Sequence, residues 1–333
     1  MALTLMDAMR RKTDDYDAGV IETFILAADI TKILPIETLG TVQKKKRRTN
    51  SIATIGFRSR GQIHGNVTGG DKDELSESVW SMGATIDIDK TEVRDKYAGN
   101  ILAERTEEAI KGAAWTFNNY FINGDHGTDP LGFEGLIVRL ALLSANQTAY
   151  GVSSSAELEA RPGTATEAQG QTLIDKIDSA RDLCDGGVAE VCVTTRRNIR
   201  AIKSALRRMG IDKPQSSLEP VTNPKDQRRS SAMPWNKPIW EYDGTRFFDM
   251  GLKADQSTAI VGSETVNSIA CDPFYFFKIG DPYLHIIQQY GMDVSRMQLL
   301  EDQVTYRSVV DWPTGIAAFH PRFASKLSGV RAA

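Results

Sequence analysis

Apolar residues recur at helical spacing over residues 95–123, with no proline in that stretch. The stripe consists of Leu102, Ala109, Ala113, Phe117 and Phe121. At 1.5 Å of rise for each of about 28 residues, this pattern predicts a helix roughly 40 Å long. Asn123 and Gly124 tolerate a left-handed backbone, so we expect the helix to end there. A long helix with a single apolar stripe must lie on another part of the protein.

Residues 51–93 alternate between apolar and polar positions, which is typical of β-strands. One predicted strand opens near Ile52, and the other covers Trp80 to Ile88. The turn residues between them include a mostly acidic group of three carboxylates and one lysine that we place at the tip: Asp71, Lys72, Asp73 and Glu74. The simplest structure is a long two-stranded β-arm. Because an isolated hairpin is only marginally stable, we expect this arm to rest on a neighbouring subunit.

Residues 1–50 contain two short amphipathic pieces and no core of their own, so they are predicted to form an arm. A dense basic cluster ends this segment: Lys44, Lys45, Lys46, Arg47 and Arg48. The cluster could contact nucleic-acid phosphates without sequence preference. It could equally be a solvated surface, or pair with the acidic tip of a neighbouring subunit.

The second half of the chain predicts a small α/β domain followed by closing strands. A helix over 172–183, a buried strand over 189–194 and a basic helix over 198–209 follow one another. The basic helix has no acidic residue, so a partner is expected for it. The aromatic residues 274–277 are interpreted as core rather than as a base-stacking platform. Strands are predicted over 284–292, 299–310 and 314–319.

Composition narrows the class of protein further. The chain has 333 residues, of which 41% are hydrophobic and 25% charged, as in a folded soluble protein. Its net charge of −3 argues against a generally basic nucleic-acid binder. Cys184, Cys192 and Cys271 are odd in number and lack C-x-x-C spacing, which favours buried thiols in a reducing cytoplasm. We find no signal peptide pattern and no apolar run of about 18 residues that would span a membrane.

A search for chemistry yields no catalytic or cofactor-binding motif. The histidines are scattered through the sequence: His64, His126, His285 and His320. Asp87 and Asp89 share a strand face, but a solvated face is preferred over a cation site. Asn123, Asp125 and Asp129 have oxygen ligands near calcium-loop spacing, yet a helix cap is preferred. The sequence therefore predicts no enzyme, no metal and no cofactor.

Four segments, taken in order, resemble the major capsid proteins of tailed bacteriophages, which have the Hong Kong 97 type fold. They are residues 2–39 (beginning ALTLMDAMRR), residues 121–136 (FINGDHGTDPLGFEGL), residues 188–206 (VAEVCVTTRRNIRAIKSAL) and residues 304–327 (beginning VTYRSVVDWP). Each motif is short, and it is their order and spacing along essentially the whole chain that carry the resemblance.

The resemblance implies an α+β fold and a division of the chain. That division is an N-terminal arm over 1–50, an extended β-arm (E-loop) over 51–93, a peripheral domain over 94–165 with a spine helix at 95–123, an axial domain over 166–282, and closing peripheral strands over 283–333. It also implies self-assembly as pentamers and hexamers into an icosahedral shell around double-stranded DNA, located in the virion and assembled in the host bacterial cytoplasm. Because the arm begins at Met1, a separate scaffolding protein is expected, together with a portal and a possible decoration protein.

Two other functions remain open from the sequence. An encapsulin-like nanocompartment would share the fold and enclose protein cargo. A non-specific DNA-binding protein would use residues 44–48 and the basic helix, with strongly salt-dependent affinity.

Overall fold

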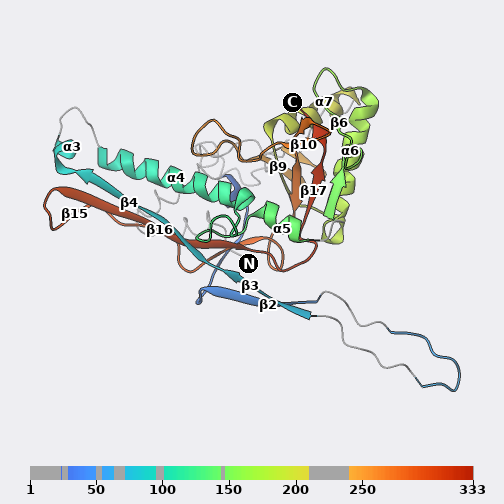
Figure 1. Ribbon diagram of the computed structural model, residues 1–333, viewed down its shortest axis with the longest axis horizontal. Coiled ribbons are helices and arrows are strands. Elements are labelled where there is room, and N and C mark those ends of the chain that lie inside the picture. Colours follow the sequence, from blue (N-terminus) through green and yellow to red (C-terminus); the bar gives the residue numbers. More distant parts are fainter. Residues whose placement is uncertain are drawn as a thin grey trace, which may run out of the picture.

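The computed structural model describes residue 24 and residues 29–49, 55–63, 72–94, 101–143, 147–209 and 240–332. Figure 1 shows a long helix over an elongated sheet, a helix-covered unit at one end, and a projecting hairpin.

The helices are η1 (Asp29–Lys32), α3 (Lys90–Arg94), α4 (Ile101–Asn123), α5 (Leu136–Leu142), α6 (Glu167–Asp182), η3 (Asp185–Gly187) and α7 (Arg196–Arg208). The strands in the first half are β1 (Ile36–Thr38), β2 (Gln43–Thr49), β3 (Lys72–Ser78), β4 (Trp80–Asp89), β5 (Thr148–Tyr150), β6 (Leu158–Glu159) and β7 (Val191–Thr194). Those in the second half are β8 (Trp240–Tyr242), β9 (Thr245–Asp249), β10 (Glu264–Val266), β11 (Ile269–Cys271), β12 (Phe274–Phe277), β13 (His285–Gln288), β14 (Asp293–Val294), β15 (Gln298–Leu299), β16 (Thr305–Ala317), β17 (Ala324–Ser328) and β18 (Val330–Arg331).

The first sheet is organised around β16, a strand of 13 residues. Its strand order is β1-β13-β16-β14, and β4 and β15 also pair with β16. The whole of β4 pairs antiparallel with β16, from Thr305↔Asp89 to Thr314↔Trp80. Gly83 lies in this ladder, where a Cβ would overlap the carbonyl oxygen of Val310. The predicted strand over 80–88 thus has β16 as a partner, and the segment near Ile52, its predicted partner, lies outside the described residues. The predicted strands over 299–310 and 314–319 were wrong as separate strands, because they belong largely to the single strand β16.

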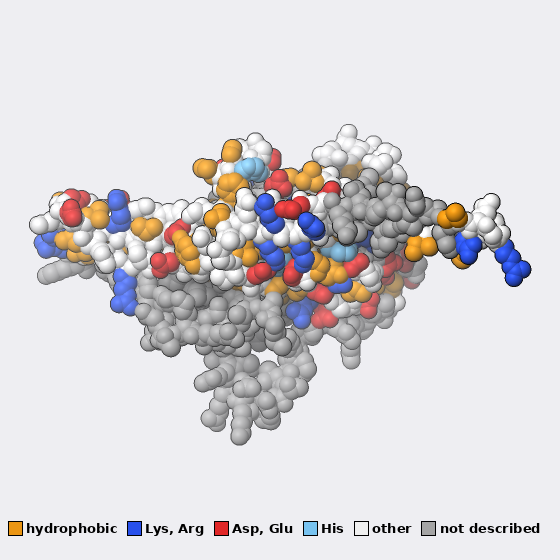
Figure 2. Space-filling view, turned by 90° about the horizontal axis from the view of Figure 1, so that it is seen from below, with side chains coloured by type: hydrophobic (Ala, Val, Ile, Leu, Met, Phe, Trp, Pro, Cys, Tyr) orange, Lys and Arg blue, Asp and Glu red, His pale blue; other side chains and the backbone are white. Residues whose placement is uncertain are grey.

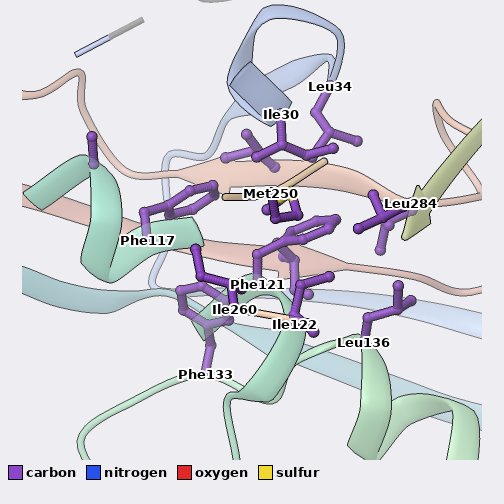
Figure 3. Packing of buried hydrophobic residues seen from close by; sticks show 14 of the residues in the cluster. Ile30, Leu34, Phe117, Phe121, Ile122, Phe133, Leu136, Met250, Ile260 and Leu284 are labelled. Carbon is purple, nitrogen blue, oxygen red and sulfur yellow. The ribbon is translucent and has the colours of Figure 1, made fainter. Parts of the chain in front are cut away.

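Helix α4 confirms the predicted long helix over the described residues, and 95–100 lie outside them. Its buried stripe includes Ile110, Ala114, Phe117 and Phe121, all less than 4% exposed. The stripe is thus rotated from the predicted Ala109 and Ala113 toward Ile110 and Ala114, because the larger side chain at 110 excludes more water. Figure 3 shows the phenylalanines of α4 packed with residues from η1 and the 250–284 region.

The end of α4 is decided by a close backbone approach rather than by the predicted left-handed cap. Gly124 is not among the residues with positive φ. Instead, the Gly135 amide donates a 2.8 Å hydrogen bond to the Gly124 carbonyl. A Cβ on Gly135 would lie 2.6 Å from the Gly124 nitrogen, so both positions require glycine for space.

The second sheet has the order β5-β17-β12-β7-β9-β8 and separates two cores. Cys192, Phe247 and Phe276 are neighbours across three strands and face the core that contains α6 and α7. Val193, Phe248 and Tyr275 form the next row and face the core that contains α4. This alternation follows from the two-residue period of a strand. The burial of all of β12 confirms that residues 274–277 are core.

Capping residues explain where α6 and α7 begin. Thr166 and Gln169 form a capping box, in which the Thr166 amide donates to Gln169 Oε1 at 2.8 Å. Helix α6 therefore begins five residues before the predicted position 172. Thr195 accepts a hydrogen bond from the Asn198 amide and starts α7 at Arg196.

The chain enters the second sheet more than once. Strand β5 at 148–150 and strand β17 at 324–328 pair with each other in parallel at one edge of it. The axial domain was predicted as 166–282 and the closing peripheral strands as 283–333. The structure instead places β17 next to β12, in register from Phe274↔Leu327 to Phe277↔Ala324. The α/β unit is thus built from separated stretches, with β17 paired between β5 and β12.

Candidate assembly surface

The projecting hairpin consists of β2 and β3, which pair antiparallel over the seven residues of β2. The basic cluster of residues 44–48 lies in β2, and three of its five residues are opposite acidic residues of β3. The register is Lys44↔Glu77, Lys45↔Ser76, Lys46↔Leu75, Arg47↔Glu74 and Arg48↔Asp73. Opposite charges across a ladder are favourable, so β3 of the same chain supplies acidic partners, which one of the sequence-based alternatives placed on a neighbouring subunit.

This register corrects two predictions about the β-arm. The arm begins at Gln43 rather than at residue 51, because the basic residues are themselves a strand. Asp73 and Glu74 are not at its tip but in β3, where Glu74 lies 3.6 Å from the Lys45 ammonium. Lys72 begins β3, and Asp71 lies outside the described residues.

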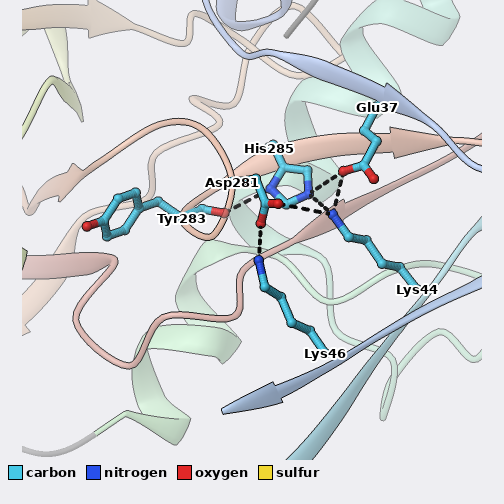
Figure 4. A network of polar contacts seen from close by, with 6 residues as sticks. All are labelled: Glu37, Lys44, Lys46, Asp281, Tyr283 and His285. Atoms are coloured by element: carbon cyan, nitrogen blue, oxygen red, sulfur yellow. Dashed lines mark hydrogen bonds and ion pairs between the residues drawn. The ribbon is translucent and has the colours of Figure 1, made fainter. Parts of the chain in front are cut away.

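Two lysines of β2 fasten the hairpin base to the first sheet (Figure 4). Lys46 Nζ donates a 2.7 Å hydrogen bond to Asp281 Oδ1. Lys44 Nζ pairs with Glu37 and lies 3.8 Å from Asp281 Oδ2. Both ammonium groups also lie over the Phe319 ring, at 5.4 and 5.7 Å from its centroid. Partial burial opposes ionisation of Asp281, but the hydrogen bond from Lys46 and the two lysine charges hold its pKa below the ordinary value.

His285 lies buried behind these lysines. Its Nδ1 is 2.9 Å from the Tyr283 carbonyl oxygen, which can only accept, so Nδ1 carries the proton. Nε2 then faces the Lys44 ammonium at 3.3 Å as an acceptor. Burial lowers the pKa of His285 below 6.5, and the Lys44 charge lowers it further. The Tyr283 hydrogen bond and the carboxylates of Glu37 and Asp281 oppose that shift.

This environment predicts that protonation of His285 destabilises the folded subunit at acidic pH. Below about pH 6.5, His285 becomes protonated in the unfolded chain but stays neutral in the folded chain. The free energy of unfolding therefore decreases as the pH is lowered. We expect the unfolding temperature to drop more steeply between about pH 7 and pH 5 in the wild type than in His285→Gln. Calorimetry of both proteins over this range measures the difference, and parallel curves would contradict the assignment.

A second anchor joins β3 to α5. Arg139 Nη1 and Nη2 both donate to the Glu77 carboxylate, the second at 2.8 Å. Arg139 also donates to the carbonyl oxygens of Glu134 at 3.0 Å and Ile316 at 3.1 Å. The two side chains are only 9% and 16% exposed. Sequence reasoning missed this pair, although a lone arginine in the apolar stretch 135–143 was a usable signal.

Apolar contacts complete the hairpin base. Val79, Ile287, Ala317 and Phe319 form a small buried cluster, and Leu39 and Leu75 pack against it. Together with the ion pairs, this cluster holds the near end of the hairpin against the first sheet.

The far end of the hairpin has the opposite character. Residues 55–63 extend away from the body (Figure 1), and apolar and basic side chains are visible at that end of the molecule (Figure 2). Ile55, Phe57 and Ile63 are 82%, 110% and 95% exposed. A turn at Ser59–Gln62 bends the chain, with Arg58 Nη1 donating to the Gln62 carbonyl at 2.7 Å. Three large apolar side chains exposed on one extended segment mark an interaction surface.

The remaining candidates have structural roles where they are described. Arg307 donates to both oxygens of Asp87 at 2.6 Å, and Asp89 accepts from the Thr91 amide at the start of α3. Asp125 and Asp129 accept from backbone amides of their own loop. In the described part of the chain no cluster of three acidic, histidine or cysteine side chains could hold a metal ion. Nor is any helix among those residues long and apolar enough to cross a membrane.

The other histidines do not meet in one site. His126 stacks beside Trp80 with ring centroids 4.9 Å apart, and His320 Nε2 lies 3.8 Å from Asp185 Oδ1. His64 falls outside the described residues, as do residues 1–23 of the predicted arm.

Comparison with solved structures finds the same architecture elsewhere, although no family model and no curated protein matches the sequence. An encapsulin complex from Synechococcus elongatus matches with a TM-score of 0.57 at 10% identity, over 91% of this chain and 87% of that chain. A protein of Mycobacterium phage Bobi matches with a TM-score of 0.53 at 11% identity, over 91% and 89%. The capsid of Myoviridae phage XM1 matches with a TM-score of 0.53 at 10% identity, over 88% and 88%. These likenesses cover nearly the whole chain and establish its fold.

Proposed function

We propose that this chain, which has the Hong Kong 97-like α+β fold, is the major capsid protein of a tailed phage. Its copies would associate as pentamers and hexamers into an icosahedral shell around double-stranded DNA. The shell would be assembled in the host bacterial cytoplasm and located in the virion. Its role is mechanical, with no reaction catalysed. A scaffolding protein, a portal and a decoration protein are the further partners that this role implies.

The observation that carries the proposal is the contrast between the two ends of the hairpin. The base is fixed by buried ion pairs and apolar contacts, so the direction of the hairpin is set by the subunit itself. The tip exposes Ile55, Phe57 and Ile63 to water. Burying each such side chain is worth about 1.5–3 kcal/mol, which favours a neighbouring copy covering them. In this proposal, the β-arm comprises residues 43–78, α4 is the spine helix, and the α6–α7 unit is the axial domain.

The tip provides the direct test of assembly. We expect the double variant Phe57→Ser/Ile63→Ser to raise the protein concentration needed for shell formation at least about tenfold, since about 1.4 kcal/mol of lost contact suffices for that change. Sedimentation velocity with electron microscopy of the particles measures it. Because both side chains are exposed in the subunit, its unfolding temperature should not change.

Leu252→Ser is the matched control, because Leu252 is 47% exposed on a loop away from the hairpin. It should assemble as the wild type does. Normal shells from the tip variant, or a wild-type chain that stays monomeric at every concentration, would overturn the proposal.

An encapsulin-like shell around protein cargo is the second candidate, and the encapsulin match supports it directly. The two functions differ in what particles produced in bacteria contain. Large particles filled with DNA, formed when phage packaging components are present, support the capsid. Small uniform shells that co-purify with one protein support the nanocompartment.

A non-specific DNA-binding protein is the weakest of the three candidates. Lys44, Lys45 and Lys46 each pair with a carboxylate of the same chain, which lowers the positive charge available to phosphates. Contact between the shell and packaged DNA remains part of the capsid proposal, without sequence specificity.

A further inference from the structure

Helices α6 and α7 lie side by side on one face of the second sheet, at the end of the molecule away from β15 (Figure 1). A Cβ on Gly170 would lie 3.3 Å from the Ala205 Cβ, so the two helices pack closely. Their apolar sides share one core, and their outer sides face away from the sheet.

The outer side of α7 is entirely basic. The helix carries Arg196, Arg197, Arg200, Lys203, Arg207 and Arg208, and no acidic residue. Arg196, Arg197, Arg200 and Arg207 are exposed. Cations of one sign at helical spacing repel one another, so this surface gains from an acidic partner. We call it the basic ridge.

The outer side of α6 has the opposite charge. Its exposed charged residues are Glu167, Asp175 and Asp182, while Lys176 of the same helix is half-buried. Asp178 and Arg181 also belong to α6 but pair with each other at 3.1 Å, and Arg181 pairs with Asp243 at 2.8 Å. Glu167, Asp175 and Asp182 form what we call the acidic ridge.

The two ridges match in spacing. Arg200 and Arg207 are seven residues apart, as are Asp175 and Asp182. Two helical turns make each separation about 10.5 Å, so both charge pairs can form at once when the ridges of two molecules meet.

We infer that the basic ridge of one subunit docks on the acidic ridge of the next copy around each ring of the shell. Such a contact joins two different surfaces and closes when the rotation between copies closes, as a pentamer or hexamer requires. The inference rests on the proposed shell function. A nucleic acid fits the basic ridge less well, because the acidic ridge lies on the adjacent helix and repels phosphates.

Charge exchange tests this contact. The variants Arg200→Glu/Arg207→Glu and Asp175→Lys/Asp182→Lys should each reduce the yield of shells at least about tenfold, by placing like charges opposite one another. The quadruple variant carries both changes and restores opposite charges, so it should recover yield to within about threefold of the wild type. Arg200→Lys/Arg207→Lys is the matched control and should assemble normally. Sedimentation velocity measures yield, and circular dichroism confirms that each subunit is folded.

The possible outcomes distinguish failure of the ridge contact from failure of the proposed shell function. A wild-type chain that forms no shells defeats the proposed function. Wild-type shells combined with a quadruple variant no better than either double variant, all of them folded, overturn the ridge contact. So would double variants that assemble normally but package less DNA, which would assign the basic ridge to the nucleic acid.

Discussion

Replacing Arg139 with methionine is expected to lower the free energy of unfolding of the unassembled subunit by about 3–5 kcal/mol. The substitution keeps most of the side-chain volume but leaves the Glu77 carboxylate, 16% exposed, without its cation. The carbonyl oxygens of Glu134 and Ile316 lose a donor as well. Urea titration followed by circular dichroism measures the loss.

Two further variants test whether the loss comes from the uncompensated Glu77 carboxylate. Glu77→Leu combined with Arg139→Met removes both charges, so it should recover most of the stability. Arg105→Met removes an exposed pair with Glu108, 3.2 Å apart, and should cost less than about 1 kcal/mol. Equal losses for Arg139→Met and Arg105→Met would mean that the hairpin base is not anchored as described.

Phe117→Ala is expected to cost a further large amount, about 3–5 kcal/mol, because it empties the centre of the main core. The Phe117 ring contacts Trp312 at 5.1 Å, Phe133 at 5.8 Å and Phe121 at 6.4 Å between centroids. These partners come from β16, the loop after α4, and α4 itself, and rigid elements on all sides cannot collapse into the space.

The matched control is Leu131→Ala. Leu131 lies in the loop after α4 and is 81% exposed, so its loss should stay within about 0.5 kcal/mol. Urea titration of both variants against the wild type separates them. A Phe117→Ala loss below about 1 kcal/mol would show that α4 is not held on the sheet through this ring.

Both predictions concern how firmly the subunit holds its own hairpin. Phe117 holds α4 on the β4–β16 ribbon, and Arg139 fixes the hairpin base beside the same ribbon. A tip that extends from a rigid base reaches a defined position, whereas a tip on a loose base would lose binding free energy to ordering. In the proposed shell, the anchor would therefore link core packing to assembly.

Local patterns were enough to predict the elements that depend on neighbours in sequence. The stripe with Phe117 and Phe121 predicted α4, and the short run at 189–194 predicted the strand that the structure places at 191–194 as β7. The resemblance of four ordered segments predicted the fold, which the comparisons established. In each case the signal lies within one helix or strand, or in the order of such segments.

Pairing between distant segments was decided only by the tertiary structure. The alternation in 80–88 indicates a strand but does not identify β16 as its partner. A period-two pattern shows which face of a strand is buried, not which strand more than 200 residues away pairs with it. The cations at 44–48 look the same in sequence whether they meet phosphate, a neighbour or the carboxylates of β3, Glu37 and Asp281. The sequence by itself determined the long helix α4, the helices α6 and α7, and strands such as β4 and β7. Which of them meet depended on close packing and charge pairing across the whole fold, since those contact energies exist only once the chain is folded.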